Sequence, residues 1–265
     1  MRPYWLYDLS SPVLCFLVLG VFVAICLAGL FLTRGRVRRL HGRDHSHNDI
    51  VGFYLAAIAV IDAITLGLVA VGTWETYTEV QLRVDHEAAA LASIYRDASG
   101  YPEPLRERLQ GDLQVYYHQV VYVAWPMQRR GIIADVSGVA LQQFQKDFMT
   151  FEPTTEQQKI LSAETYRAFN ELTECRRNRI DSVTTELPGP LWLMVLAGAL
   201  VGIASTWLFH TASFGIHVWL SVVFSILIAL PIYIIVALDN PYRGQISVGP
   251  EPLERVHDQL MVANH

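Results

Sequence analysis

Hydrophobic residues form long runs in the first third and the last third of the chain, and a region rich in charged residues separates them. Charged residues are absent from 12–33, reduced to Asp62 between 50 and 73, and absent again from 187–238. Because the hydrocarbon core of a bilayer is about 30 Å thick, roughly 20 apolar residues of helix are needed to cross it. The pattern predicts an all-α membrane protein with four transmembrane helices in two hairpins, at about 12–33, 50–73, 190–209 and 215–238.

The charged region predicts a helical soluble domain over 74–188. It is inserted between an N-terminal membrane hairpin and a C-terminal one, with a tail after the last span, so the full division is 1–73, 74–188, 189–238 and 239–265. No Pro or Gly lies between Gly72 and Gly100, so the second span should continue into the soluble domain as one helix. Its polar half carries an apolar stripe near helical spacing, which needs a packing partner: Val80, Val84, Leu91, Ile94 and Ala98.

Three further helices are expected in the soluble domain. One begins at Leu105 and should end or kink at Trp125–Pro126, and the next covers about 132–148. The third covers about 154–186, where Thr154 and Gln157 have the spacing of a capping box. The sequence 187–190 contains two prolines and a glycine and should break the helix before the third span.

An arginine cluster follows the first apolar run: Arg34, Arg36, Arg38, Arg39 and Arg43. A cleavable signal peptide has the reverse arrangement, so the run is read as a membrane span. Positive charge near span ends stays in the cytoplasm, which predicts an extracytoplasmic soluble domain and extracytoplasmic termini. The arginines at 176, 177 and 179 oppose this orientation, although long loops are translocated largely regardless of charge.

Composition narrows the class of protein. The mean hydropathy is +0.28 and 52% of residues are hydrophobic, as in membrane proteins. A net charge of −5, without a basic surface element, argues against a nucleic-acid partner. The excess of Arg over Lys and the Ala- and Val-rich spans are typical of a GC-rich bacterial genome, so we expect a multi-pass protein of a bacterial inner membrane. Three cysteines cannot form a disulfide framework.

Motifs for catalysis or cofactor binding are not recognisable. The sequence lacks a Gly-rich phosphate loop, an HExxH motif and a GxSxG motif, so no enzyme activity and no cofactor are predicted. His45 and His47, beside Asp44 and Asp49, are too few and too weakly patterned for a metal site. We read them as a solvated turn in which Asn48 or Asp49 caps the second span.

Asp62 is the most informative single residue, because a carboxylate at the centre of a span costs about 2.5–3.5 kcal/mol on insertion scales. On a helix, Thr65 and Thr73 lie on the same side as Asp62, so the three form a polar intramembrane face. Such a face lines either a water-filled path or a packed interface in which the carboxyl group is protonated or hydrogen-bonded.

Small residues recur every four positions in the spans and allow close approach of helices in lipid. These close helix contacts could form within one chain or between subunits. The residues are Gly198 and Gly202, then Ser221, Ser225 and Ala229, and in the first span Gly20, Ala24 and Ala28.

Several short phrases, in this order, resemble the bacterial bestrophin-like family, a domain of unknown function that is distantly similar to bestrophin anion channels. The likeness covers about residues 45–253. The phrases are His47-Asn48-Asp49, Trp74-Glu75-Thr76-Tyr77, Glu87-Ala88-Ala89-Ala90-Leu91, Trp125-Pro126, Arg176 with Arg179, Leu187-Pro188, Leu191-Trp192, and the turn Asp239-Asn240-Pro241-Tyr242-Arg243-Gly244 after the last span.

The resemblance implies a pentameric homo-oligomer in the lipid bilayer whose second span lines a pore for inorganic ions. By position, that role would fall to the face with Asp62 and Thr65. It also implies that the soluble domain is cytosolic, whereas the arginine cluster after the first span predicts that it is extracytoplasmic. Several Asp62 carboxylates around one pore would favour cations unless protonated. The acidic calcium-binding cluster of bestrophins is not recognisable, so no calcium site is predicted.

The sequence therefore favours an oligomeric, bestrophin-like ion channel or conduit. The alternative is a membrane-anchored interaction or sensory module without transport activity, in which the spans only anchor the soluble helices. A membrane-embedded enzyme ranks third, because one buried carboxylate does not specify a reaction.

Overall fold

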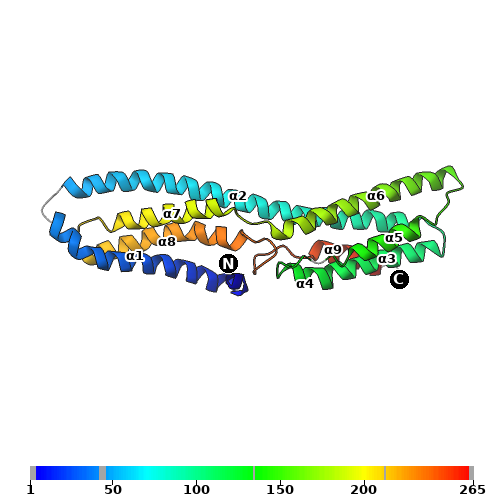
Figure 1. Cartoon of the computed structure of the whole chain (residues 1–265), viewed down its shortest axis with the longest axis horizontal. Helices are drawn as coiled ribbons and strands as arrows, with labels where there is room; N and C mark the ends of the chain where they lie inside the picture. Colours follow the sequence, from blue (N-terminus) through cyan, green and yellow to red (C-terminus); the bar gives the residue numbers. More distant parts are fainter. Residues whose placement is uncertain (1–3, 42–45, 134, 212, 263–265) are drawn as a thin grey trace. The chain divides into compact units, whose positions relative to one another are not determined.

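The computed structural model describes residues 4–41, 46–133, 135–211 and 213–262. Its regular structure across these residues is entirely helical (Figure 1). The chain divides into two compact units. Unit 1 comprises Met1–Thr76, Glu186–Asn240 and Gly244–Ile246, and unit 2 comprises Tyr77–Thr185, Pro241–Arg243 and Ser247–His265.

Unit 1 contains four helices that are long and apolar enough to cross a membrane. A short 3-10 helix, η1 (Tyr4–Asp8), precedes them, and the four are α1 (Ser11–His41), the first half of α2 (Ser46–Ala98), α7 (Gly189–Thr206) and α8 (Phe214–Leu238).

The second span and its extension form one uninterrupted helix, as predicted. Helix α2 has 53 residues, which at 1.5 Å per residue gives a length of about 80 Å. That is more than twice the thickness of a bilayer core. Because an unbroken helix of this length cannot be contained in the hydrocarbon, its second half is available to build unit 2.

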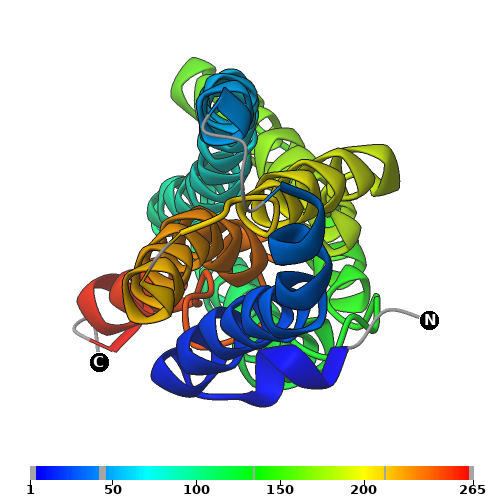
Figure 2. The same cartoon turned by 90° about the vertical axis from the view of Figure 1, so that its left-hand side faces the viewer.

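Helices α1, α7 and α8 lie side by side in unit 1 (Figure 2). The indole ring of Trp207 covers Gly29, where a Cβ would overlap the ring, and Trp207 Nε1 donates to the Cys26 carbonyl at 3.0 Å. Gly202 faces Phe224 and Ile228 of α8. The small residues of α7 therefore serve packing within the chain, whereas Gly20 has nothing from the described residues within 4 Å.

Unit 2 is built from the second half of α2 and shorter helices. These are α3 (Leu105–His118), the π-helix η2 (Gln119–Ala124), α4 (Trp125–Gln128), α5 (Gly138–Phe148), α6 (Glu156–Asp181), the 3-10 helix η3 (Ser182–Thr184), α9 (Glu251–Val256) and the π-helix η4 (His257–Val262).

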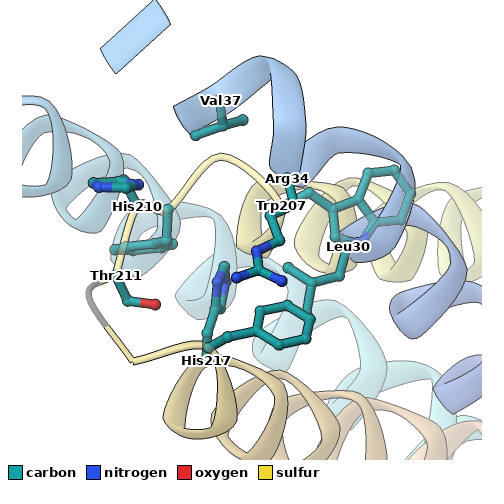
Figure 3. Close-up of a pocket in the computed structure, with 9 residues that line it drawn as sticks. Leu30, Arg34, Val37, Trp207, His210, Thr211 and His217 are labelled. Atoms are coloured by element: carbon teal, nitrogen blue, oxygen red, sulfur yellow. The ribbon is translucent and has the colours of Figure 1, made fainter. Parts of the chain in front are cut away.

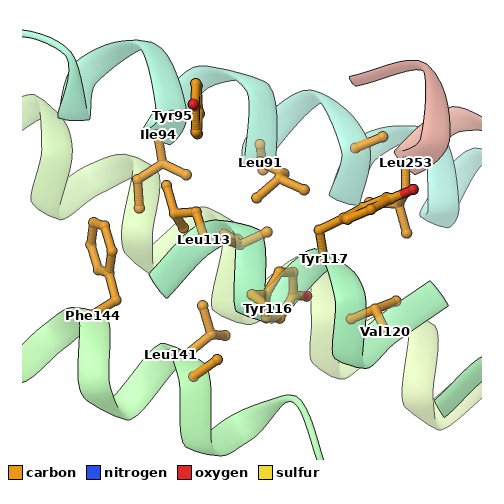
Figure 4. Close-up of a cluster of buried hydrophobic side chains, with 14 of the residues drawn as sticks. Leu91, Ile94, Tyr95, Leu113, Tyr116, Tyr117, Val120, Leu141, Phe144 and Leu253 are labelled. Carbon is orange, nitrogen blue, oxygen red and sulfur yellow. The ribbon is translucent and has the colours of Figure 1, made fainter. Parts of the chain in front are cut away.

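The predicted apolar stripe of α2 is confirmed as part of the unit 2 core. Its five residues are all at most 2% exposed. Figure 4 shows Leu91 and Ile94 of α2 facing a cluster that includes Leu113 of α3 and Phe144 of α5. Burial of this stripe, at roughly 25 cal/mol per Å² of apolar surface, is what fixes the extended half of α2 to the rest of unit 2.

Two local predictions in unit 2 are wrong, and a third holds to within two residues. Helical structure passes Trp125–Pro126 as α4, with Pro126 in its first turn, where its missing N–H is not needed, and ends at Gln128. The next helix begins at Gly138 rather than near 132, because Gly131 takes φ +73° and ends α4. The capping box of α6 uses Thr155 and Gln158, one position later than expected.

The segment after α8, predicted as a C-terminal tail over 239–265, contains helices that belong to unit 2. Leu253 and Met261 are buried in the core of unit 2, at 0% and 1% exposed. The imidazole of His257 stacks on Tyr117 with ring centroids 4.2 Å apart. The C-terminal helices α9 and η4 thus complete unit 2.

Candidate functional site

Asp62 lies on α2 against Gly198 of α7, within unit 1. A Cβ at position 198 would overlap the Asp62 carboxylate, so the glycine provides the space that this side chain occupies. Asp62 is 6% exposed, and its Oδ1 has no hydrogen-bond partner among the described residues. A buried carboxylate oxygen without a partner on an apolar helix is costly, which makes Asp62 the candidate functional residue.

A surface cavity of about 370 Å³ adjoins this carboxylate. Asp62 and Thr65 of α2 form one wall and Met194, Gly198 and Val201 of α7 form the other. Apart from Asp62 and Thr65, the lining is apolar. We call this feature the α2–α7 groove.

Thr73 does not belong to the groove. It is 4% exposed, and its Oγ1 donates to the Val69 carbonyl of its own helix at 2.8 Å. Its hydroxyl is therefore satisfied locally, as is common for threonine in membrane helices. The structure brings Asp62 and Thr65 together in one cavity, one helical turn apart, and places Thr73 elsewhere.

The turn after the last span has separate roles in the two units. In unit 1, the Leu187 N–H donates to Asp239 Oδ1 at 2.5 Å and the Tyr7 hydroxyl donates to Oδ2 at 3.3 Å. Asn240 Nδ2 donates to the Tyr7 hydroxyl oxygen at 2.7 Å. Asp239 therefore joins the start of the chain to the segment that leads into α7. Gly244 takes φ +86°, a conformation that requires glycine.

In unit 2, the same turn supplies Pro241 and Tyr242. The Pro241 carbonyl accepts from the Val248 N–H at 2.7 Å. Tyr242 is 1% exposed, and its hydroxyl donates to the backbone carbonyl of Arg179 at 3.2 Å. The turn after α8 thus reaches a buried charged residue.

Arg179 forms an ion pair with Glu87 in the interior of unit 2, and both side chains are 0% exposed. Arg179 Nε donates to Glu87 Oε2 at 2.5 Å, and one of its Nη atoms donates to Gln128 Oε1 at 2.8 Å. The Tyr116 hydroxyl donates to Glu87 Oε1 at 2.5 Å. These four residues come from α2, α3, α4 and α6 and link those helices through polar contacts.

Burial and the negative charge of Glu87 raise the pKa of Tyr116 well above its usual range. The phenol therefore stays protonated and donates to the carboxylate. For Arg179, burial disfavours the charge, but Glu87 and Tyr116 more than compensate, so the pKa of the guanidinium is raised. Arg179 therefore remains charged in the core.

Sequence reasoning did not identify this network, although Glu87, Trp125, Arg179 and Tyr242 all occur in the phrases that carried the family resemblance. One feature of the sequence could have pointed to this buried network. Glu87 follows Val84 by three residues and precedes Leu91 by four, so it occupies a core position in the apolar stripe. A charged residue at such a position requires a buried partner.

The predicted solvated turn around His45 and His47 differs from the expectation in the part that the structure describes. Asp44 and His45 lie outside the described residues. His47 Nε2 is 2.9 Å from the Leu208 carbonyl, and Asn48 caps no helix but bonds the backbone of His210. Within the described ranges, no group of three or more His, Cys, Asp or Glu residues is placed to hold a metal ion.

Unit 2 also contains a pair of carboxyl groups. Burial, and then the negative charge of Asp147, raise the pKa of Asp112 to about 6. The folded state thus binds this proton more tightly than the unfolded chain, whose aspartate pKa is about 3.9. The favourable contribution is complete below about pH 4 and is lost as the pH rises through 6.

We therefore expect Asp112→Asn to raise the melting temperature at pH 7.5, with the gain shrinking toward pH 4. Thermal unfolding of the purified protein at several pH values measures it. Glu171→Gln, which removes a carboxylate from the exposed face of α6, is the control and should give no such pH-dependent gain. A gain of equal size at pH 4 and pH 7.5 would contradict the prediction.

The comparisons with known proteins agree with the resemblance. The sequence model of the Bestrophin-like domain family matches residues 20–253 of this chain. A variant of a bacterial bestrophin homologue from Klebsiella pneumoniae has a similar structure, with a TM-score of 0.72 and 11% identity over 94% of this chain and 98% of that chain. Another structure of that homologue gives a TM-score of 0.69 and 11% identity, covering 93% and 97% of the two chains. A structure described as a membrane protein has a TM-score of 0.65 and 11% identity, over 94% of this chain and 97% of that chain. A search of curated proteins gave no match.

Proposed function

The chain belongs to the Bestrophin-like family, and from this premise we propose that it forms a homo-oligomeric ion channel or related conduit in a bacterial inner membrane. In this proposal α1, the first half of α2, α7 and α8 are the four spans, and a helical soluble domain is inserted between the two hairpins. The resemblance implies a pentamer, which closes as a ring when each subunit uses the same head-to-tail contact. Inorganic ions are the proposed cargo.

The observation that carries the proposal is how little of the apolar part of α2 is buried within the single chain. Only 17% of its apolar segment is buried within the chain, compared with 28–39% for the other three membrane helices. The α2–α7 groove on this helix holds a carboxylate oxygen without a partner among the described residues. Lipid tails cannot satisfy that oxygen, whereas water, an ion or a neighbouring subunit can.

A second surface supports association between copies. Gly20, Ala24 and Ala28 of α1 are exposed in the single chain, and small residues at this spacing favour close helix contacts in lipid. The proposal therefore places α1 and α2 at or near contacts between subunits. Asp62 and Thr65 are then the proposed polar face of the conduit.

The first test is the mass of the purified protein in detergent, measured by light scattering or native mass spectrometry. We expect a single ring-sized homo-oligomer, and ion flux when that oligomer is placed in liposomes. A monomer, or an oligomer that conducts nothing across a range of voltage and calcium concentration, would favour the membrane-anchored interaction module instead.

The orientation is tested by cysteine labelling. On the arginine count, a Glu107→Cys variant without the native cysteines should react with a membrane-impermeant maleimide in intact spheroplasts, because position 107 is exposed in the soluble domain. Gly35→Cys, beside the arginine cluster, is the matched control and should react only after lysis. The opposite pattern would place the soluble domain in the cytosol, as the bestrophin resemblance implies.

A further inference from the structure

A second cavity, of about 240 Å³, lies in unit 1 where the loop between α7 and α8 meets the end of α1. Its lining includes Leu30 and Arg34 from α1, Trp207 and His210 from the loop region, and Phe214 and His217 from α8 (Figure 3). It shares no lining residue with the α2–α7 groove. The ion conduit proposed above does not account for it.

Among the described residues that line this cavity, Arg34 carries the one fixed charge, and His210 and His217 add imidazole nitrogens. Figure 3 shows the guanidinium of Arg34 and the imidazole of His217 directed into the cavity, with His210 at its edge. None of the described residues that line it is acidic. A guanidinium with no carboxylate among the described lining residues favours an anion, and its planar set of N–H donors matches the oxygens of a phosphate group.

These groups are held in place before any ligand arrives. His217 is 8% exposed, and its Nε2 is 3.0 Å from the carbonyl of Thr206. Because a carbonyl only accepts, Nε2 carries a proton that this bond already uses, so His217 shapes the cavity wall and Arg34 supplies the charge. The guanidinium carbon of Arg34 lies 3.8 Å from the centroid of the Phe214 ring, which limits the positions that the side chain can take.

The loop that carries His210 is held from a third helix. Asn48 of α2 donates through Nδ2 to the His210 carbonyl at 2.5 Å, and its Oδ1 accepts from the His210 N–H at 3.0 Å. This pair of hydrogen bonds fixes the backbone next to the cavity. It also explains why Asn48 does not cap α2.

The start of α8 adds a further positive contribution. The helix begins at Phe214 in the cavity wall and has 25 residues, and no side chain caps its first N–H groups. An uncapped helix N-terminus attracts anions through those N–H groups and through the helix dipole. The cavity, the Arg34 guanidinium and the N-terminus of α8 therefore coincide at one place.

We propose that this cavity binds the phosphate group of an anionic phospholipid. Lipid is favoured over a free phosphate ion because the cavity lies at the ends of apolar helices whose neighbouring residues are exposed. Phe31 and Leu32 beside Arg34 are 62% and 79% exposed, and Ile216 beside His217 is 60% exposed. A phosphate in the cavity would leave its acyl chains on this apolar surface, where they replace water.

The test uses the full-length protein in detergent and follows its melting temperature during titration with phosphatidylglycerol, phosphatidylcholine or inorganic phosphate. Phosphatidylglycerol is expected to stabilise the protein most. Arg34→Gln should weaken its apparent affinity about tenfold, the effect of losing one hydrogen bond between charged groups. His210→Gln, which leaves the buried His217 in place, should weaken it by a smaller factor.

Arg36→Gln is the matched control, because it removes the same charge from α1 two residues beyond the cavity. It should leave the affinity within about twofold of the wild type, because Arg36 does not line the cavity. Equal losses in Arg34→Gln and Arg36→Gln would overturn the proposal in favour of general charge attraction. So would equal stabilisation by phosphatidylcholine, or an Arg34-dependent effect of inorganic phosphate that phosphatidylglycerol does not reproduce. None of these outcomes depends on ion conduction.

Discussion

Arg179→Met is expected to destabilise unit 2 by about 3–5 kcal/mol, which would abolish folding of a marginally stable domain. The reason is that the substitution leaves the Glu87 carboxylate in the core without its counter-charge, where both side chains are 0% exposed. Gln128 would also lose the donor for its Oε1. Thermal unfolding of the purified protein, followed by circular dichroism, measures the effect.

Arg177→Met is the control, because Arg177 lies on the exposed face of α6 two residues away. It should change stability by less than about 0.5 kcal/mol. The double variant Glu87→Leu with Arg179→Met removes both charges and should recover a large part of the stability lost in either single variant. If the double variant were as unstable as the sum of the single ones, the two residues would not act as a pair.

The second large effect is expected for Asp62→Asn in a conducting preparation. A cation about 4 Å from a carboxylate is attracted by about 1 kcal/mol in bulk water and about 4 kcal/mol at an effective dielectric constant of 20. Loss of an interaction between these two limits should lower the ratio of cation to anion permeability by about fivefold or more. Reversal potentials in planar bilayers under a salt gradient report that ratio.

Two further variants separate the charge of Asp62 from its place in the groove. Asp49→Asn removes a carboxylate from the exposed start of α2 and should leave selectivity nearly unchanged. Gly198→Ala keeps the charge but adds a Cβ where the Asp62 carboxylate lies, so it should disturb conduction without neutralising the residue. Unaltered selectivity in a conducting Asp62→Asn channel would remove Asp62 from the ion path.

Much of the architecture follows from the sequence, for reasons that act locally along the chain. The absence of charge over about 20 residues decides that a helix is apolar enough to enter lipid, and the absence of Pro and Gly between Gly72 and Gly100 decides that α2 continues unbroken. The spacing of Val80, Val84 and Leu91 identifies the face of α2 that is buried. Helix ends were less predictable, because the π-helix at Gln119–Ala124 and the left-handed Gly131 depend on packing around them.

The tertiary structure alone decided which distant residues meet. Glu87 and Arg179 are 92 residues apart in sequence, and the partner of each became visible only when α2 and α6 were seen together. The same holds for Asp62 with Gly198, and for Arg34 with His217. Periodicity reports which side of a helix is buried, but it carries no information on which other helix covers that side. A polar side chain in the interior acquires its role from that covering surface, because its free energy depends on the partner that replaces water.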